Sequence, residues 1–267
     1  MEFFNILVGI DFDVSNVQLI KFSFELAKSQ NAKITFVHCY HPNPKDIELG
    51  KTDPEKAHLG KLVNLIDPIG NLYVDVEYIS VVIPQFTVDG LVSYQIENEH
   101  DLIIVGKSKN NSWIPTKSKS VIISEKCNIP TIIIPEDFRM INLNNVVFNL
   151  DFEFREIEKI YDLLILCDRL GAILTCVHVT DRKSKEQAIQ NMNVYKKLFE
   201  GQLIQDNINF ELLDQSNNRE LEFFAKDIEA DIIVLSKTRK TWINHYIQLK
   251  EEKLSKQIGV PILLFNF

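Results

Sequence analysis

The fold is decided by NILVGIDF at residues 5–12, which returns in diverged form as NVVFNLDF at residues 145–152. A shift of 140 residues aligns the two stretches without a gap, and it also brings AKITFVH at 32–38 onto AILTCVH at 172–178. Self-similarity held in register over such distances is the mark of an internal repeat. The chain is therefore two diverged copies of one unit.

The repeat continues to the end of each unit with a smaller shift. At a shift of 130 residues, DLIIVGK at 101–107 matches DIIVLSK at 231–237. One residue further, CNIPTIII at 127–134 resembles IGVPILLF at 258–265. The first unit therefore carries about ten extra residues before its fourth strand. The prolines in the last pair, at positions 130 and 261, suit the opening of a strand, where proline is tolerated.

Each unit has the pattern of alternating strands and helices. Short apolar runs without polar alternation predict strands covered on both faces, at Ile6–Ile10, Ile34–Val37, Leu102–Val105 and Thr131–Ile134. Alternating strands and helices join by right-handed crossovers into a parallel sheet with helices on both faces. Helical spacing of apolar residues predicts the intervening helices. The residues on their inner faces are expected to be Val17, Ile20, Phe24 and Ala27; Ile157, Ile160, Leu164 and Cys167; Val88, Leu91, Val92 and Ile96; and Leu221, Phe224, Ala225 and Ile228.

The predicted fold class is α/β, with two tandem copies of an open parallel sheet. We expect a first domain at 1–138 and a second at 139–267, because the polar stretch Glu136–Leu143 precedes the second copy of the first strand. Composition excludes several functions. A net charge of -8 argues against a nucleic-acid coat or an anionic membrane surface, since both need a basic face. No apolar run could span a bilayer, no leader pattern opens the chain, and the four cysteines form no C-x-x-C pair, so a cytoplasmic protein with reduced thiols is expected.

In a parallel α/β sheet, ligands bind beyond the carboxyl ends of the strands. Asp11 and Asp151 follow the two copies of the first strand directly. The second candidate wall is the loop GKSKNNSWIPTKSKS at 106–120, which leads into a predicted helix whose free N–H groups could meet a phosphate. The alternative interpretation is structural: aspartate favours such turns in any case, and a basic loop is often only solvated.

The combination of ILVGID, ITFVH, DLIIVG with its long polar loop, and SEKCNIPTIIIP resembles the universal stress protein family in its tandem two-domain form. The resemblance covers both halves. It implies a five-stranded sheet of order 3-2-1-4-5 in each half, and pairing of the two domains through their last strands. It also implies, for some members, ATP bound by the aspartate after the first strand and by a phosphate loop G-x-x-G-x(9)-G-[ST].

The sequence departs from that phosphate loop in both halves. Gly106 and Ser120 match its ends, but Lys109 and Lys119 stand where the second and third glycines belong. Long side chains there obstruct the close approach of a phosphate to the backbone. In the second half the corresponding positions hold Ser236, Arg239, Lys250 and Glu251. By this comparison the first site is damaged and the second is lost.

The first half is where any ligand is expected, because it retains more of the family's residues. The candidate ligand-binding residues are Asp11, Val37, Cys39, Gly106, Lys109, Lys119 and Ser120. No metal site is expected, because His38, Cys39 and His41, with His58 further on, fit no zinc framework. His178 repeats His38 without the Cys or the second His. No catalytic motif follows any predicted strand, so the chain is not expected to be an enzyme.

These patterns favour a non-catalytic, cytoplasmic universal-stress-type protein that acts through conformation and protein contacts. We expect it to need no cofactor, although it could bind ATP or another anion weakly. The alternative is an adenine-nucleotide (ATP) binding stress sensor that uses the first half. A small-molecule hydrolase is disfavoured, since no nucleophile and base can be paired. The expected partners are the two halves for each other as an internal pseudo-dimer, a second copy of the chain, and a protein that the sequence does not identify.

Overall fold

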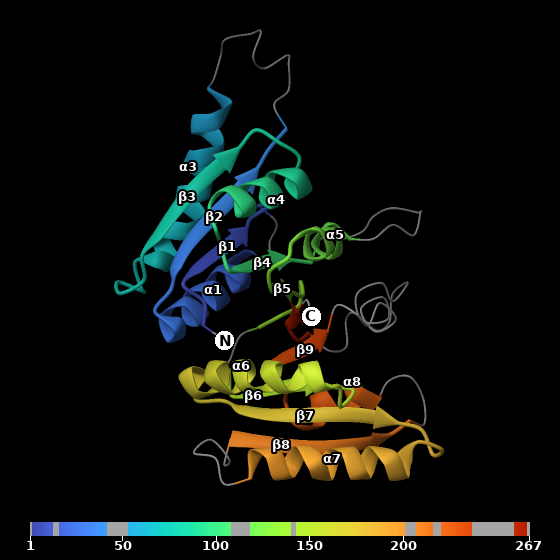
Figure 1. Cartoon of the computed structure of the whole chain (residues 1–267). Coiled ribbons are helices and arrows are strands. Elements are labelled where there is room, and N and C mark those ends of the chain that lie inside the picture. The colour runs from blue at the N-terminus through green and yellow to red at the C-terminus, as the bar shows by residue number, and fades with distance from the viewer. Residues whose placement is uncertain are drawn as a thin grey trace.

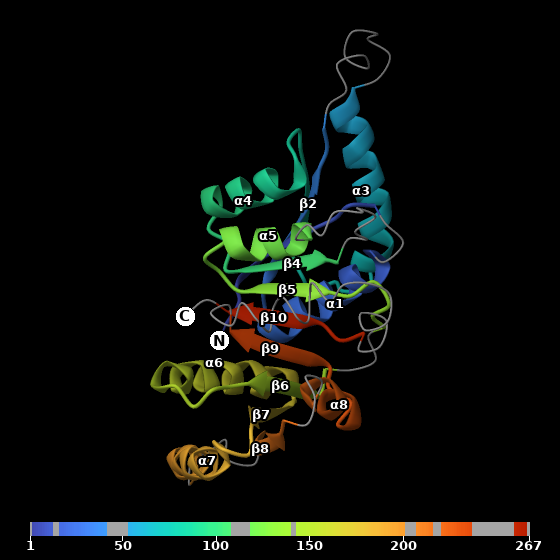
Figure 2. The same ribbon diagram turned by 90° about the vertical axis from the view of Figure 1, so that its right-hand side faces the viewer.

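The computed structural model describes residues 2–12, 16–41, 53–107, 118–139, 143–200, 207–215, 220–236 and 259–265. Ten strands in these ranges form one continuous sheet in the order β3-β2-β1-β4-β5-β10-β9-β6-β7-β8 (Figures 1 and 2). The first half supplies β1 (Asn5–Gly9), β2 (Lys33–Cys39), β3 (Tyr78–Ile83), β4 (Leu102–Gly106) and β5 (Thr131–Ile134). The second half supplies β6 (Asn145–Asn149), β7 (Ile173–Thr180), β8 (Ile208–Asp214), β9 (Ile232–Ser236) and β10 (Ile262–Phe265).

Each half confirms the predicted strand order 3-2-1-4-5, because β6 to β10 repeat the arrangement of β1 to β5. Neighbouring strands within a half are parallel. The two halves meet through their last strands, which pair antiparallel with Leu263 opposite Ile132. The internal pseudo-dimer is therefore one sheet that runs through both halves. The preceding prolines, Pro130 and Pro261, open these strands as predicted, and their carbonyls accept from Ile103 and Ile233.

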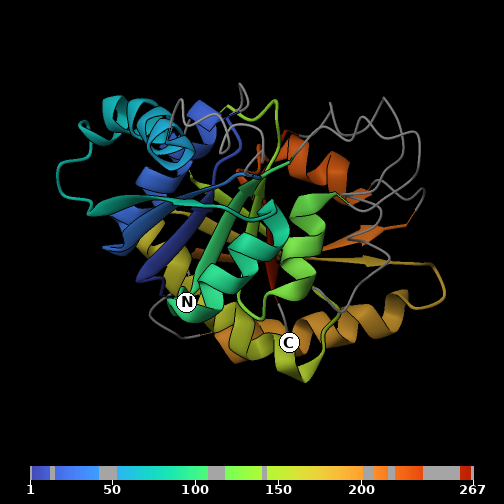
Figure 3. The same ribbon diagram turned by 90° about the horizontal axis from the view of Figure 1, so that it is seen from above.

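Helices cover both faces of the sheet (Figure 3). They are α1 (Asn16–Gln30), α3 (Pro54–Gly70), α4 (Thr87–Glu97) and α5 (Lys119–Lys126) in the first half, and α6 (Phe154–Leu170), α7 (Lys185–Phe199) and α8 (Glu220–Asp227) in the second. Side chains of α1, α3, α6 and α7 enter one hydrophobic core, while those of α4, α5 and α8 enter the other. Both cores contain residues of both halves, so the division of the sequence is not a division of the hydrophobic interior.

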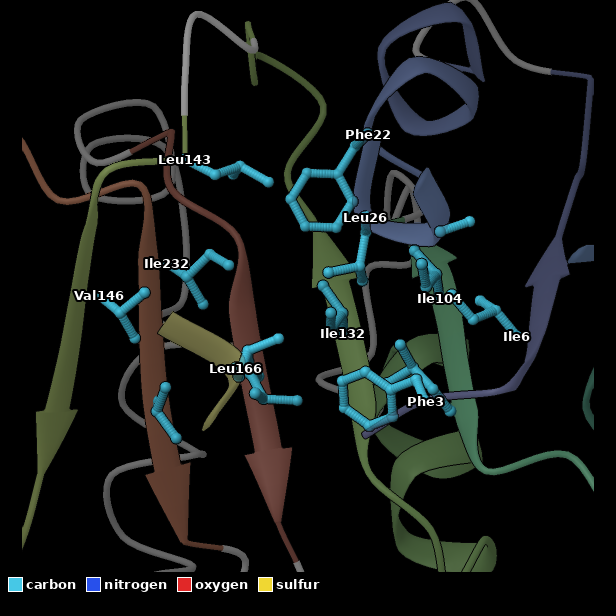
Figure 4. Packing of buried hydrophobic residues seen from close by; sticks show 14 of the residues in the cluster. Phe3, Ile6, Phe22, Leu26, Ile104, Ile132, Leu143, Val146, Leu166 and Ile232 are labelled. Atoms are coloured by element: carbon cyan, nitrogen blue, oxygen red, sulfur yellow. The ribbon is translucent and has the colours of Figure 1, made fainter. Parts of the chain in front are cut away.

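The junction between the halves is built on the face that carries α1 and α6, which pack against each other. Figure 4 shows Phe22 and Leu26 of α1 in the same cluster as Leu143, Leu166 and Ile232 of the second half. Phe22 also meets the edge of the Phe138 ring, with the centroids 5.8 Å apart. These contacts add burial to the three antiparallel residue pairs of β5 and β10, a short ladder on its own.

The repeat extends to backbone details that the sequence does not display. Left-handed φ angles recur at equivalent positions, +62° at Phe12 and +61° at Phe152, and again at Glu99 and Glu229. The aspartates that open β4 and β9 also play matching roles, because Asp101 and Asp231 accept backbone N–H groups at the start of β1 and β6. The ten extra residues of the first half lie between β2 and α3, where residues 40–53 correspond to residues 181–184.

The prediction that Val17 and Ile96 lie on the inner faces of their helices is wrong. Val17 is 41% exposed and Ile96 is 66% exposed. In α1 the predicted Ile20, Phe24 and Ala27 are buried, and the buried face extends to Leu19, Phe22 and Leu26, because this helix packs on α6 as well as on the sheet. Ile96 lies in the last turn of α4, directly after the buried Gln95, and a step of about 100° around the helix turns it to solvent.

Candidate functional site

Three of the candidate ligand-binding residues lie at one edge of the sheet in the first half. Gly9 pairs with Val37 on one side and with Val105 on the other, so the chain segments that follow β1, β2 and β4 leave the sheet side by side. Asp11, Cys39 and Gly106 therefore lie at one edge, as the sequence predicts for residues at the carboxyl ends of parallel strands. Lys109 lies outside the described residues.

Asp11 is exposed at a sharp turn, because the next residue, Phe12, has a left-handed φ of +62°. Its charge acts on a neighbour, raising the pKa of His38 against the larger opposing effect of burial. Val37 contributes little polar surface, since it is buried and its carbonyl accepts the Ile10 N–H at 2.9 Å. Cys39 is half-buried, and burial raises its thiol pKa to about 11, so it remains protonated at neutral pH.

At the two ends of the candidate phosphate loop, Gly106 has free space around it, whereas the hydroxyl groups at the start of α5 are hydrogen-bonded to each other. At Gly106 an added Cβ would meet only Leu19, at 3.4 Å. Lys119 is exposed at the first position of α5. Ser120 is 1% exposed, and its hydroxyl lies 3.0 Å from that of Ser118, which also accepts the N–H of Val121 as the helix cap. The Ser120 hydroxyl therefore already has a protein partner.

A column of rings stands over the ends of β1 and β2. Nδ1 of His38 lies 2.8 Å from the Ile10 carbonyl, and its Nε2 lies 3.1 Å from Nδ1 of His58 on α3. The two imidazoles stack with centroids 5.0 Å apart at 15°. Phe12 packs on the free face of His38 at 4.0 Å, and Tyr40 packs on His58 at 4.4 Å. These rings lie near enough to Asp11 for its charge to act on His38, while Asp11 itself is exposed.

In the second half, a carboxylate lies at the turn that follows β6, the strand equivalent to β1. The backbone N–H of Asp151 lies 3.0 and 2.9 Å from the two carboxylate oxygens of Glu156, and that of Glu153 lies 2.8 Å from one of them. Glu156 is 2% exposed, and its burial raises the pKa of the carboxyl to about 7. Carboxylates stabilise helix starts where free N–H groups converge. A carboxyl group that is an anion above its raised pKa therefore sits where the chain leaves the first strand of the second half.

The first half lacks this carboxylate. The position equivalent to Glu156 is Asn16, which is 2% exposed and whose Nδ2 has no hydrogen-bond partner among the described residues. Both halves have a histidine at the same position. Nδ1 of His178 lies 2.8 Å from the Leu150 carbonyl, and Nδ1 of His38 lies 2.8 Å from the Ile10 carbonyl. The repeated histidine therefore makes the same contact with the backbone in both halves.

Sequence analysis missed Glu156 and the contact of His58 with His38. Glu156 falls on the buried face of α6, in the first turn, and a charged residue at such a position signals a capping role. His58 gave no comparable signal, because its contact with His38 depends on how α3 docks after the ten-residue insertion. In the described ranges, no group of three or more histidine, cysteine, aspartate or glutamate side chains could hold a metal ion.

Comparison with known proteins places this arrangement in a family. The profile of the universal stress protein family matches residues 2–135, and the chain belongs to that family. No curated protein matches the chain. The chain is structurally similar to a universal stress protein from Archaeoglobus fulgidus, with a TM-score of 0.68, 14% identity and coverage of 98% of both chains.

Two further solved structures share the full-length fold. A protein of unknown function from Pseudomonas aeruginosa PAO1 matches with a TM-score of 0.65 and 10% identity, covering 99% of this chain and 92% of its own. The cytoplasmic domain of a prokaryotic cation chloride cotransporter matches with a TM-score of 0.52 and 9% identity, covering 98% and 94%. At such identities the likeness shows the tandem fold alone. None of the helices that the structure describes has the length and apolar character needed to cross a bilayer.

Proposed function

We propose that this is a non-catalytic, cytoplasmic universal-stress-type protein that acts through its conformation and its contacts with other proteins. The observation that carries the proposal is the Glu156 carboxylate, which accepts the backbone N–H groups of Asp151 and Glu153 within the second half. An anionic ligand at that place would meet a buried carboxylate instead of free donors. Like charges in a site of low dielectric repel strongly.

The first half supports the proposal with a different arrangement. The ring column of Phe12, His38, His58 and Tyr40 lies beside Asp11, and the Ser120 hydroxyl is hydrogen-bonded within its own helix start. Phosphoryl transfer needs a positioned metal, a charge clamp and an oriented water. The lysines that replace the loop glycines in the sequence supply charge without the backbone cradle, which favours loose anion binding over catalysis.

Contact with other proteins is favoured by an edge of the sheet. β3 pairs only with β2 among the described strands, and its sequence YISVVI carries no charge. Ile79 in this strand is 57% exposed. Uncharged, apolar edge strands recruit a further strand more readily than charged ones. The opposite edge, β8, contains Glu211 and Asp214, so the two ends of the sheet differ in the partners that they would accept.

The second candidate function is an ATP-binding stress sensor that uses the first half. Two observations favour it: Asp11 is exposed, and an added Cβ at Gly106 would meet only Leu19. Protein purified without added nucleotide distinguishes the candidates. We expect no adenine absorbance and no release of phosphate from added ATP. An adenine chromophore that is lost in Asp11→Ala and retained in the matched Asp151→Ala variant would favour the sensor.

A further inference from the structure

The pair of histidines in the first half joins three elements of the fold. His38 is the penultimate residue of β2 and contacts the Ile10 carbonyl, which follows β1. His58 lies in the second turn of α3. The only direct polar link between the two side chains is the 3.1 Å contact of His38 Nε2 with His58 Nδ1. This contact fastens the start of α3 to the carboxyl ends of β1 and β2.

The proton arrangement of the pair follows from the carbonyl. Nδ1 of His38 must donate to the Ile10 oxygen, so in the neutral ring Nε2 is an acceptor and His58 donates from Nδ1. One added proton is accommodated, because His38 can then donate to a His58 that has changed tautomer. Two added protons place N–H groups face to face at 3.1 Å, and the bond is lost.

The surroundings oppose the doubly charged pair. Burial lowers the pKa of both imidazoles, and each ring also feels the positive charge of Lys61 from α3. Asp11, after β1, is the neighbouring charge that favours protonation of His38. Tyr40, which follows β2, stacks its ring on that of His58. Burial, followed by the charges of Glu55 and Asp53, raises the pKa of that tyrosine.

We propose that His38 and His58 form a proton-operated latch that holds the start of α3 on the ends of β1 and β2 and releases it when both rings are charged. The second half has no such latch in its described part, because α7 presents the Tyr195 ring to Phe152 there, and the Tyr195 hydroxyl donates to the Glu153 carbonyl. Release exposes the faces of Phe12 and Tyr40 in one half only. The latch needs no ligand to act.

Hydrogen exchange, corrected for the intrinsic effect of pH, tests the latch in the full chain. Between pH 7.5 and pH 5 the amides of residues 57–62 should lose protection at least about tenfold, since opening of a local unit sets their exchange. The corresponding turns of α7 should keep theirs. Unchanged protection of residues 57–62 at pH 5 would overturn the latch.

Variants separate the latch from general acid sensitivity. His58→Phe keeps a ring in the column without a proton to gain, so the protection of residues 57–62 should no longer depend on pH. His178→Gln and His100→Gln should leave the transition of residues 57–62 intact, although His100 is buried and its pKa is lowered by that burial. If His58→Phe responds to acid as the unaltered protein does, the pair is not the latch.

A second readout covers the case in which His58→Phe does not fold. The ring resonances of His38 and His58 in the unaltered protein should titrate in two coupled steps, the second of them below the ordinary histidine pKa. Independent single steps near the ordinary pKa, about 6.5, would overturn the proposal.

Discussion

The two halves differ most where the chain leaves the first strand. After β1 the buried position is Asn16, and the neighbouring space is covered by the stacked rings of His38 and His58. After β6 the same position is Glu156, whose carboxylate accepts the N–H groups of the turn. The left-handed turn and the histidine bound to the carbonyl before it are the same in both. The two halves therefore share one backbone arrangement but place different side chains beside it: two histidines in the first half and a buried glutamate in the second.

This difference teaches that the duplication preserved the scaffold more strictly than the site. The shared features hold the backbone: the caps by Asp101 and Asp231, the left-handed turns and the antiparallel junction of β5 with β10. The features that differ determine what the ends of the strands can bind. We expect the halves to have separate roles within one rigid sheet.

The largest effect is expected from removing the second half altogether. A chain that ends at Glu136 would expose the β5 edge and a core face normally covered by α6 and by residues such as Leu166. Apolar sheet edges recruit partners or aggregate. The truncated chain should therefore dimerise or precipitate in light-scattering measurements. A stable, soluble monomer would show that the first half does not depend on the second.

The next effect concerns the acid of the second half. The pKa of Glu156 rises from 4.5 to about 7 in the folded protein, so the folded state binds this proton more tightly than the unfolded state. The contribution of Glu156 to the free energy of unfolding should therefore fall by about 3 kcal/mol as the pH rises from about 4.5 to about 7.

Glu156→Gln tests this contribution. Relative to the unaltered protein, the variant should gain stability over that pH range in urea unfolding, because glutamine keeps an acceptor without a charge. The matched variant is Glu158→Gln, since Glu158 is exposed in the same helix. A constant difference between the protein and Glu156→Gln from pH 4.5 to pH 8 would contradict the assignment of a buried acid.

A smaller effect is expected at the junction. Arg169 of α6 donates to the Gln30 carbonyl at the end of α1 at 3.1 Å, and it also pairs with Glu2. Arg169→Ala should lower the free energy of unfolding by about 1 kcal/mol, because the bonds are partly exposed. Arg155→Ala is the control, since Arg155 pairs with Glu153 inside one half. If both variants lose the same free energy of unfolding, the contact between the halves stabilises the protein no more than an ion pair within one half.

The sequence itself predicted two parallel halves, because buried parallel strands leave apolar runs that a repeat makes visible twice. The strand order and the pairing of the last strands were what the resemblance to the universal stress protein family implied, and the structure confirms both. It predicted Val17 and Ile96 wrongly, since helical spacing does not reveal which face a neighbouring helix covers. At the site it placed Asp11, Cys39 and Gly106 at one edge, as strand ends require. The contacts of Glu156 and His58 are set by side-chain packing after a turn and an insertion, and residue spacing does not encode them.

The measurement that tests the account most directly is calorimetric titration of the full chain with ATP at low and at physiological salt. Side chains of the protein stand beside Asp11 and beside Asp151, and lysines without a backbone cradle bind phosphate loosely and with strong dependence on salt. The dissociation constant should be no tighter than about 0.1 mM, which corresponds to roughly 5–6 kcal/mol. Micromolar binding that survives added salt and disappears in Asp11→Ala, but not in Asp151→Ala, would contradict the account and establish the first half as a nucleotide sensor.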